Sequence, residues 1–138
     1  MPRKFFSFFL LAAFLSIGFY SCCSTQKVAH VSKNSLDWAG EYKGVVPAAD
    51  CSGIDVSIRI ERDGTFELRY KYLDKSDDVF IEKGTFKWDN AGGIITLDIR
   101  DYPPHYKVGE NVLIQLDMSG KVISGDLAGM YVLKKAQQ

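Results

Sequence analysis

The residues whose types could carry chemistry are few, and the most prominent of them lies in a single loop. The 138 residues include three cysteines and two histidines. Cys51 is the only cysteine outside the N-terminal leader, and it lies in the stretch 44–54, GVVPAADCSGI. A thiolate is a soft ligand that suits Cu(I), and an unpaired thiol in an oxidising compartment is open to disulfide formation. Cys51 is therefore the candidate metal or thiol site.

The residues around Cys51 predict an ordered loop between two strands. Pro47 lacks a backbone donor, so a paired strand cannot continue through it. Asp50 can turn its carboxylate back onto nearby backbone N–H groups, and Gly53 permits dihedral angles that other residues resist. The candidate loop site therefore consists of Pro47, Asp50, Cys51 and Gly53.

Other soft or borderline ligands are distant from Cys51 in the sequence. Met118 falls in a predicted turn, Met130 opens the last predicted strand, and His105 lies in a predicted Tyr-Pro-Pro-His-Tyr loop. A largely buried free cysteine is the alternative interpretation of Cys51, and copper is the one cofactor left open. The sequence contains no Gly-x-Ser-x-Gly elbow and no metal-ligand cluster, so we expect no catalytic residues and no enzyme.

The first 21 residues have the composition of a signal peptide. Arg3 and Lys4 precede the apolar stretch 5–19, which is shorter than the roughly 20 residues that a spanning helix needs. The sequence then reads Tyr-Ser-Cys-Cys, which looks like a lipobox with Cys22 as the lipidated, palmitate-bearing residue and Cys23 as the alternative. An uncleaved anchor or an ordinary signal peptide is the other interpretation.

The leader and the charge balance indicate where the protein works. The residue after Cys22 is not acidic, which favours a lipid anchor in the outer membrane with the domain facing the periplasm. The chain carries 17 basic and 17 acidic residues with no basic patch, so we expect no nucleic-acid partner. We divide the chain into a signal peptide (1–21), a lipidated cysteine with a flexible tether (22–36), a β-barrel (37–134) and a tail (135–138).

The stretch 37–134 reads as short strands separated by turns. Apolar residues alternate over 54–60 and 66–72, and Asp63-Gly64 between them predicts a hairpin. The alternation slips at Gly84, which predicts a β-bulge. Further strands are expected over 39–46, 79–88, 95–99, 106–108, 112–116, 121–124 and 130–134. This pattern predicts an all-β fold, a small antiparallel up-and-down β-barrel of about eight strands.

Several motifs resemble one family in their order and spacing. They are WAGEYKG (38–44), P-x-A-D-C-x-G-I (47–54), DGTF (63–66), GTF (84–86), YKVGEN (106–111) and LD-x-x-GK (116–121). Together they resemble the N-terminal domain of NlpE-type lipoproteins over about 38–133. The resemblance implies a lipocalin-like barrel in an outer-membrane lipoprotein. It also implies a link to copper tolerance and to envelope-stress signalling through a sensor kinase.

Two departures from the family pattern concern the same chemistry. The family loop usually carries Pro-Cys-x-x-Cys, and Ala48 stands at the first cysteine position. Two thiols can share one soft metal ion or cycle as a dithiol, whereas Cys51 alone can do neither. The sequence also ends close to the barrel, without the second, oligonucleotide-binding-type domain of longer members.

These observations give one functional hypothesis and two alternatives. The hypothesis is a non-catalytic envelope lipoprotein, resembling NlpE, in copper homeostasis or envelope-stress sensing. Its expected partners are the membrane, through the lipid anchor, and an envelope protein or sensor kinase. The alternatives are a lipocalin-like binder of a small apolar ligand and a protein-interaction module.

Overall fold

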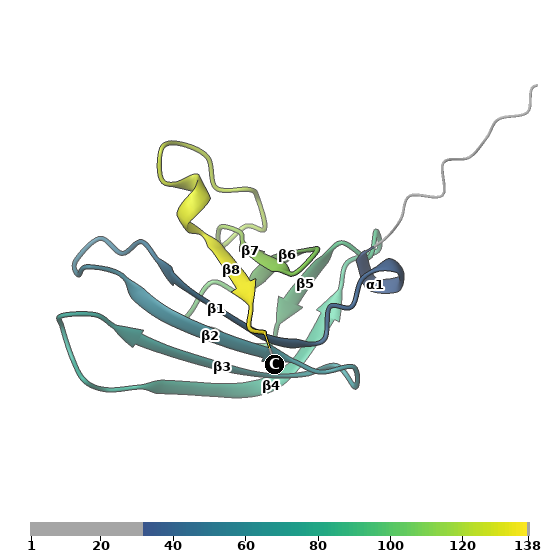
Figure 1. Cartoon of the computed structure of the whole chain (residues 1–138), viewed down its shortest axis with the longest axis horizontal. Coiled ribbons are helices and arrows are strands. Elements are labelled where there is room, and N and C mark those ends of the chain that lie inside the picture. The colour runs from purple at the N-terminus through teal and green to yellow at the C-terminus, as the bar shows by residue number, and fades with distance from the viewer. Residues whose placement is uncertain (1–31, 138) are drawn as a thin grey trace, which may run out of the picture.

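The strands close into a barrel in the computed structural model, which describes residues 32–137 (Figure 1). Each strand pairs antiparallel with the next, and β8 pairs with β1. The strands are β1 (Gly40–Val46), β2 (Ile54–Ile60), β3 (Thr65–Tyr72), β4 (Phe80–Trp88), β5 (Ile94–Leu97), β6 (His105–Gly109), β7 (Val112–Gln115) and β8 (Val132–Lys135). The predicted all-β up-and-down barrel is thereby confirmed.

The alternating sequences of β2 and β3 form the predicted hairpin. Ile58 lies opposite Leu68 and Ile60 opposite Phe66, and all four side chains are buried. Paired residues share one face of a sheet, so the alternation turns both apolar sets toward the barrel interior. In the turn, Gly64 adopts a φ of 88°, which an L-residue with a side chain resists.

The connections differ in length at the two ends of the barrel. Four long connections, 47–53, 73–79, 98–104 and 116–131, leave from one end, which we call the loop end. The short turns 61–64, 89–93 and 110–111 lie at the other, which we call the turn end. In Figure 1 the loops after β1 and β3 lie at the left, and β1 starts at the right beside α1.

The turn end is closed by an aromatic cluster. The Trp38 ring meets the ring of Phe86 edge-on at 5.9 Å and that of Trp88 at 5.3 Å between centroids. Its indole N–H donates to the Lys33 carbonyl, and the buried Tyr42 hydroxyl donates to the Trp38 carbonyl at 2.7 Å. These contacts fix the chain where it enters β1.

The chain approaches the barrel through an ordered helical turn, α1 (Ser32–Ser35). Ser32 Oγ donates to the Val108 carbonyl at 2.7 Å, and Lys33 N donates to the Gly92 carbonyl at 3.0 Å. These residues therefore differ from the flexible tether predicted over 22–36, because hydrogen bonds to turn-end residues hold them in place. The predicted signal peptide and Cys22 lie outside the described residues.

The β-bulge predicted at Gly84 is wrong. β4 pairs with β3 without interruption from Thr85 opposite Thr65 to Phe80 opposite Tyr70. The alternation slips because Ile81 and Val79, just before the strand, are 50% and 52% exposed rather than turned into the core. Gly84 has a different role, since a Cβ there would lie only 3.1 Å from the Phe66 ring.

The strand predicted over 121–124 is also absent, and the last strand starts later than expected. The connection 116–131 contains one isolated bridge, Leu116 to Val122, and a 3₁₀ turn, η1 (Ala128–Met130). The side chain of Val122 is 65% exposed, so it does not pack against the barrel core as a strand residue with an inward side chain would. Among residues 32–137, no helix has the length and apolar character to cross a membrane.

Candidate functional site at the loop end of the barrel

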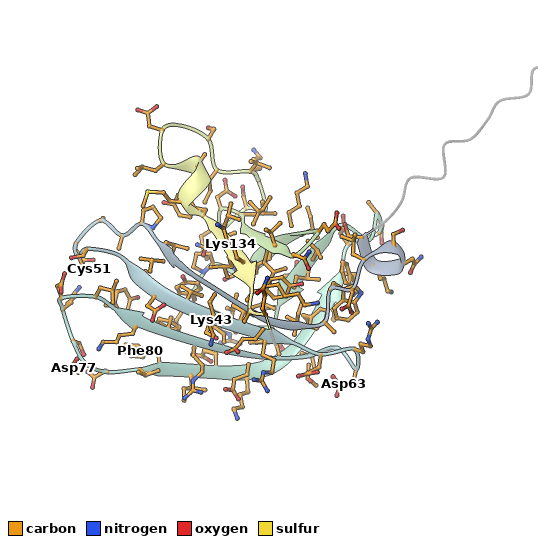
Figure 2. All side chains as sticks on the ribbon, in the orientation of Figure 1. Lys43, Cys51, Asp63, Asp77, Phe80 and Lys134 are labelled. Atoms are coloured by element: carbon orange, nitrogen blue, oxygen red, sulfur yellow. The ribbon has the colours of Figure 1, made fainter. Side chains whose placement is uncertain are left out.

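The cysteine loop 47–53 is tied to the neighbouring loop 73–79. Lys75 forms an ion pair with Asp50, and Ser52 Oγ donates to the Asp74 carboxylate. The Leu73 N–H donates to the Gly53 carbonyl at 2.9 Å. Three contacts thus join segments that the sequence separates by a complete β-hairpin. In Figure 2 the labelled Cys51 and Asp77 lie at the same end of the barrel.

The loop residues singled out in the sequence shape this loop in different ways. Pro47 follows the last residue of β1, where it ends the strand as predicted. Gly53 has a φ of 152°, and a Cβ there would lie 2.7 Å from Val45 Cγ1. The pKa of Asp50 is lowered mainly by its hydrogen bond and charge interaction with Lys75, and only slightly by its own backbone N–H. Asp50 therefore serves chiefly to join two loops, a role that its sequence position did not indicate.

Cys51 is half-buried rather than largely buried. Its thiol donates to the Gly53 carbonyl, with Sγ and the oxygen 3.1 Å apart, and it lies within electrostatic range of Lys75. No group of three or more His, Cys, Asp or Glu side chains in the stretch 32–137 is arranged to hold a metal ion. Copper at Cys51 stays a prediction.

The other soft or borderline ligands lie on separate elements. His105 begins β6 instead of lying in a loop, and its Nδ1 is 3.0 Å from Thr96 Oγ1. Met118 and Met130 are 62% and 50% exposed, and Met130 does not open the last strand as predicted. The reason is that Met130 belongs to η1, two residues before β8.

An aromatic cluster inside the loop end was only partly visible in the sequence. The Tyr70 ring stacks on Phe80 at 5.1 Å and on Tyr102 at 4.8 Å, and Tyr72 meets Phe80 edge-on at 5.9 Å. Tyr70 and Tyr72 follow from the strand alternation over 66–72, whereas the slip predicted at Gly84 did not indicate the position of Phe80. Tyr102 comes from the loop 98–104 and is only 4% exposed. The adjacent prolines predicted a loop there, but not that its tyrosine turns inward.

Polar groups accompany this cluster. The Tyr102 hydroxyl lies 3.4 Å from Oε1 of the buried Gln115. The Tyr106 hydroxyl is fully buried and has no hydrogen-bond partner among the described residues. Burial raises the pKa of both tyrosines, and the nearby Tyr72 and Tyr70 raise that of Tyr102 further. Both hydroxyls are therefore neutral at physiological pH.

The fold is that of a small, closed, eight-stranded up-and-down β-barrel domain, with an ordered loop that carries a cysteine. The NlpE N-terminal domain family matches residues 42–126, so the chain belongs to that family. Lipoprotein NlpE of Escherichia coli (strain K12) is 31% identical over 98 residues, a match that covers 70% of this chain. The match spans 40% of that relative's length.

Two solved structures resemble the barrel. A crystal structure assigned as that of a lipoprotein from Shewanella oneidensis has a TM-score of 0.72 and 43% identity, covering 79% of this chain and 98% of that one. The Cpx pathway activator NlpE from Escherichia coli has a TM-score of 0.51 and 26% identity, covering 64% of this chain and 46% of that one. The barrel thus corresponds to part of the longer Escherichia coli protein.

Proposed function

We propose that this chain is a non-catalytic lipoprotein of the cell envelope that reports envelope stress to a protein partner. The observation that carries the proposal is the family match over 42–126, together with the barrel's similarity to a relative described as a Cpx pathway activator. The partner is an envelope protein of the sensor-kinase type, and the lipid is carried by Cys22 in the outer membrane.

The geometry of the barrel supports a partner contact at the loop end. The first described residues, Ser32 and Lys33, are hydrogen-bonded to turn-end residues, so the described part of the chain begins at the turn end. A lipid on Cys22 would therefore tether the turn end and leave the loop end directed away from its membrane. Surface loops held on a rigid scaffold are common positions for recognition.

The proposal is tested in Escherichia coli cells that lack their own NlpE and carry a Cpx pathway reporter. Production of the full chain is expected to raise the reporter signal. The Cys22→Ser variant, which cannot be acylated at that position, should change the response at equal protein level because the domain is no longer held at its membrane. A reporter that stays at the level of the empty vector would rule the proposal out for this pathway.

Copper homeostasis is the second candidate, and the half-buried thiol of Cys51 favours it. A single thiol needs a second soft donor, so Cu(I) would be completed by a further side chain or by another molecule. Titration of the full chain with Cu(I) is expected to give a site that Cys51→Ser removes and Ser52→Ala retains. Equal, weak binding by all three proteins would discard the copper role.

A small apolar ligand within the barrel stays a prediction without a specific observation in its favour among residues 32–137. The inward side chains form one continuous buried cluster, to which each of the eight strands contributes at least one buried residue. Native mass spectrometry of freshly purified protein tests the idea directly. A co-purified ligand would revive it, and a protein that is bare in every preparation would remove it.

A further inference from the structure

The first half of β4 is an unpaired sheet edge. Over Phe80–Gly84, β4 has β3 on one side, and its pairing with β5 begins only at Phe86. No other backbone hydrogen bond within residues 32–137 involves this segment, the nearest being from Asp98 N to the Thr85 carbonyl. The reason is a difference in strand length, since β4 extends well beyond the four-residue β5 toward the loop end.

This edge is apolar on both faces. Val79, Phe80 and Ile81 are 52%, 42% and 50% exposed. In the neighbouring β3, by contrast, the outward residues opposite this segment are charged: Arg69 lies opposite Ile81, and Glu67 lies opposite Lys83. Phe80 is held in place, because its ring stacks on Tyr70 and meets Tyr72 edge-on. Figure 2 shows Phe80 on the same side of the loop end as Asp77.

The edge has only part of the usual protection against strand addition. Soluble β proteins commonly guard exposed edges with proline, a bulge, an inward-pointing charge or lysine. The segment 79–82 contains no proline and no lysine, and its pairing with β3 has no bulge. Glu82 shares the inward phase of Phe80 and is half-buried, and Lys83 stands only at the far end. An apolar edge with free N–H and C=O groups is suited to pair with an added strand.

The charges around the edge indicate which kind of partner would bind there. The two loops beside the edge, 73–79 and 98–104, hold five acidic residues and two basic ones: Asp74, Asp77, Asp78, Asp98 and Asp101 against Lys75 and Arg100. On the strands, Glu67 and Glu82 are matched by Arg69 and Lys83, and Lys71 pairs with Asp77, so these surroundings carry a net charge of −2. A second copy of the barrel would bring an equally acidic end to the contact, and an anionic lipid surface would also be repelled. A positively charged partner is attracted.

We propose that the β4 edge is a docking site for an extended segment of a partner protein that alternates basic and apolar residues. The segment adds as a ninth strand beside Phe80–Gly84. Its backbone groups pair with the free edge, its apolar side chains pack on one face beside Ile81 and Val79, and its basic side chains lie on the other face toward Glu82 and the loop aspartates. This inference rests on the proposed partner-dependent function and specifies the surface and the chemistry of the contact.

The probe is the synthetic peptide Lys-Val-Lys-Val-Lys-Val-Lys, added to the full chain. We expect saturable binding by calorimetry, with slower hydrogen exchange of the backbone amides in 80–84. Two matched peptides separate strand pairing from charge attraction: one N-methylated at every peptide bond, and Glu-Val-Glu-Val-Glu-Val-Glu. Both are expected not to bind, because the first lacks backbone donors and the second carries the wrong charge.

Two variants with the same change in charge test the location. Ile81→Lys places a charge on the edge and should weaken binding by about tenfold or more, the loss expected from one central contact residue. Val122→Lys, at an exposed apolar position on the connection 116–131, should stay within about twofold, because it alters only the general charge.

Four results would overturn the inference: no peptide binding, equal losses in the two variants, binding of the N-methylated peptide, or exchange protection elsewhere than 80–84. Self-association of the chain through 80–84, seen by analytical ultracentrifugation and abolished by Ile81→Lys, would also overturn it in favour of a second copy. Because the readout is direct binding, its failure leaves the Cpx reporter test standing, and a silent reporter leaves the edge contact standing.

Discussion

The two ends of the barrel stabilise their connections in different ways. At the turn end, Asp63 and Asp89 bind backbone N–H groups of their own short turns, and Trp38 closes the interior. At the loop end, Asp117 binds its own turn in the same way, but Asp50 and Asp77 pair with lysines of other segments, and apolar side chains remain exposed. The turn end thus closes the interior, while the loop end leaves apolar side chains exposed, as the proposed partner contact requires. Such a division is expected because binding segments come from the less stable parts of a protein.

The largest difference between the ends should appear on truncating an aromatic side chain at each. Trp38→Ala is expected to lower the free energy of unfolding by about 3–5 kcal/mol, since it leaves a cavity against Phe86 and Trp88. Phe80→Ala, at a side chain that is 42% exposed, should cost only about 1 kcal/mol. Urea denaturation measures both. Equal losses would mean that the loop end contributes as much to stability as the turn end.

The next largest loss of stability is expected from a substitution that strains the backbone of the cysteine loop. Gly53→Ala is expected to cost about 1–3 kcal/mol, because φ is positive and the new methyl would meet Val45 Cγ1 at 2.7 Å. Gly129→Ala is the control, since a Cβ there meets nothing within 4 Å. Thermal and urea unfolding would measure both. A Gly53→Ala protein as stable as the control would show that the loop relaxes freely.

Two buried tyrosines should respond with opposite signs to the loss of a hydroxyl. Tyr42→Phe is expected to cost about 1–2 kcal/mol, because the Trp38 carbonyl loses its donor. Tyr106→Phe is expected to raise the free energy of unfolding by up to about 1 kcal/mol, because a buried hydroxyl without a partner is removed. Urea denaturation of the two variants in parallel is the measurement. A loss at Tyr106 would indicate that a bound water or ligand satisfies its hydroxyl.

The smallest expected effect is a difference in how strongly salt changes the pKa of carboxylates at the two ends. The pKa of Asp63 and Asp89 is lowered by hydrogen bonds within their turns, and that of Asp50 and Asp77 by Lys75 and Lys71. High salt should raise the pKa of the second pair toward its ordinary value and leave the first almost unchanged. Carboxyl titrations by NMR at low and high salt would show this.

The sign of the linked effect on stability follows from these lowered pKa values. A carboxyl whose pKa is lower in the folded state contributes stability above its unfolded pKa and loses it as the pH falls through the folded value. The protein is therefore expected to lose stability below about pH 4, and salt should reduce the loop-end share of that loss. Equal salt responses at both ends would remove the distinction.

Much of the barrel could be predicted from short stretches of the sequence. The alternation in 54–60 and 66–72 and the Asp63-Gly64 turn fix one hairpin, because side-chain direction and turn conformation depend on near neighbours. Pro47 and Gly53 likewise marked the ordered loop correctly. The position of Cys51 in that loop was therefore predictable, although its half-buried thiol was not.

The remaining features depend on contacts between segments that are distant in the chain. Lys75 reaches Asp50, Tyr102 turns inward onto Tyr70, and Gly84 makes room for Phe66 rather than forming a bulge. The unpaired edge of β4 arises only because its neighbour β5 is shorter. Periodicity assigns a residue to one face of a strand, but it does not say which strand lies beside it or where that partner ends. The sequence by itself therefore determined most of the strands and, outside β4, their apolar faces, and the tertiary structure alone decided which loops meet and which edge stays open.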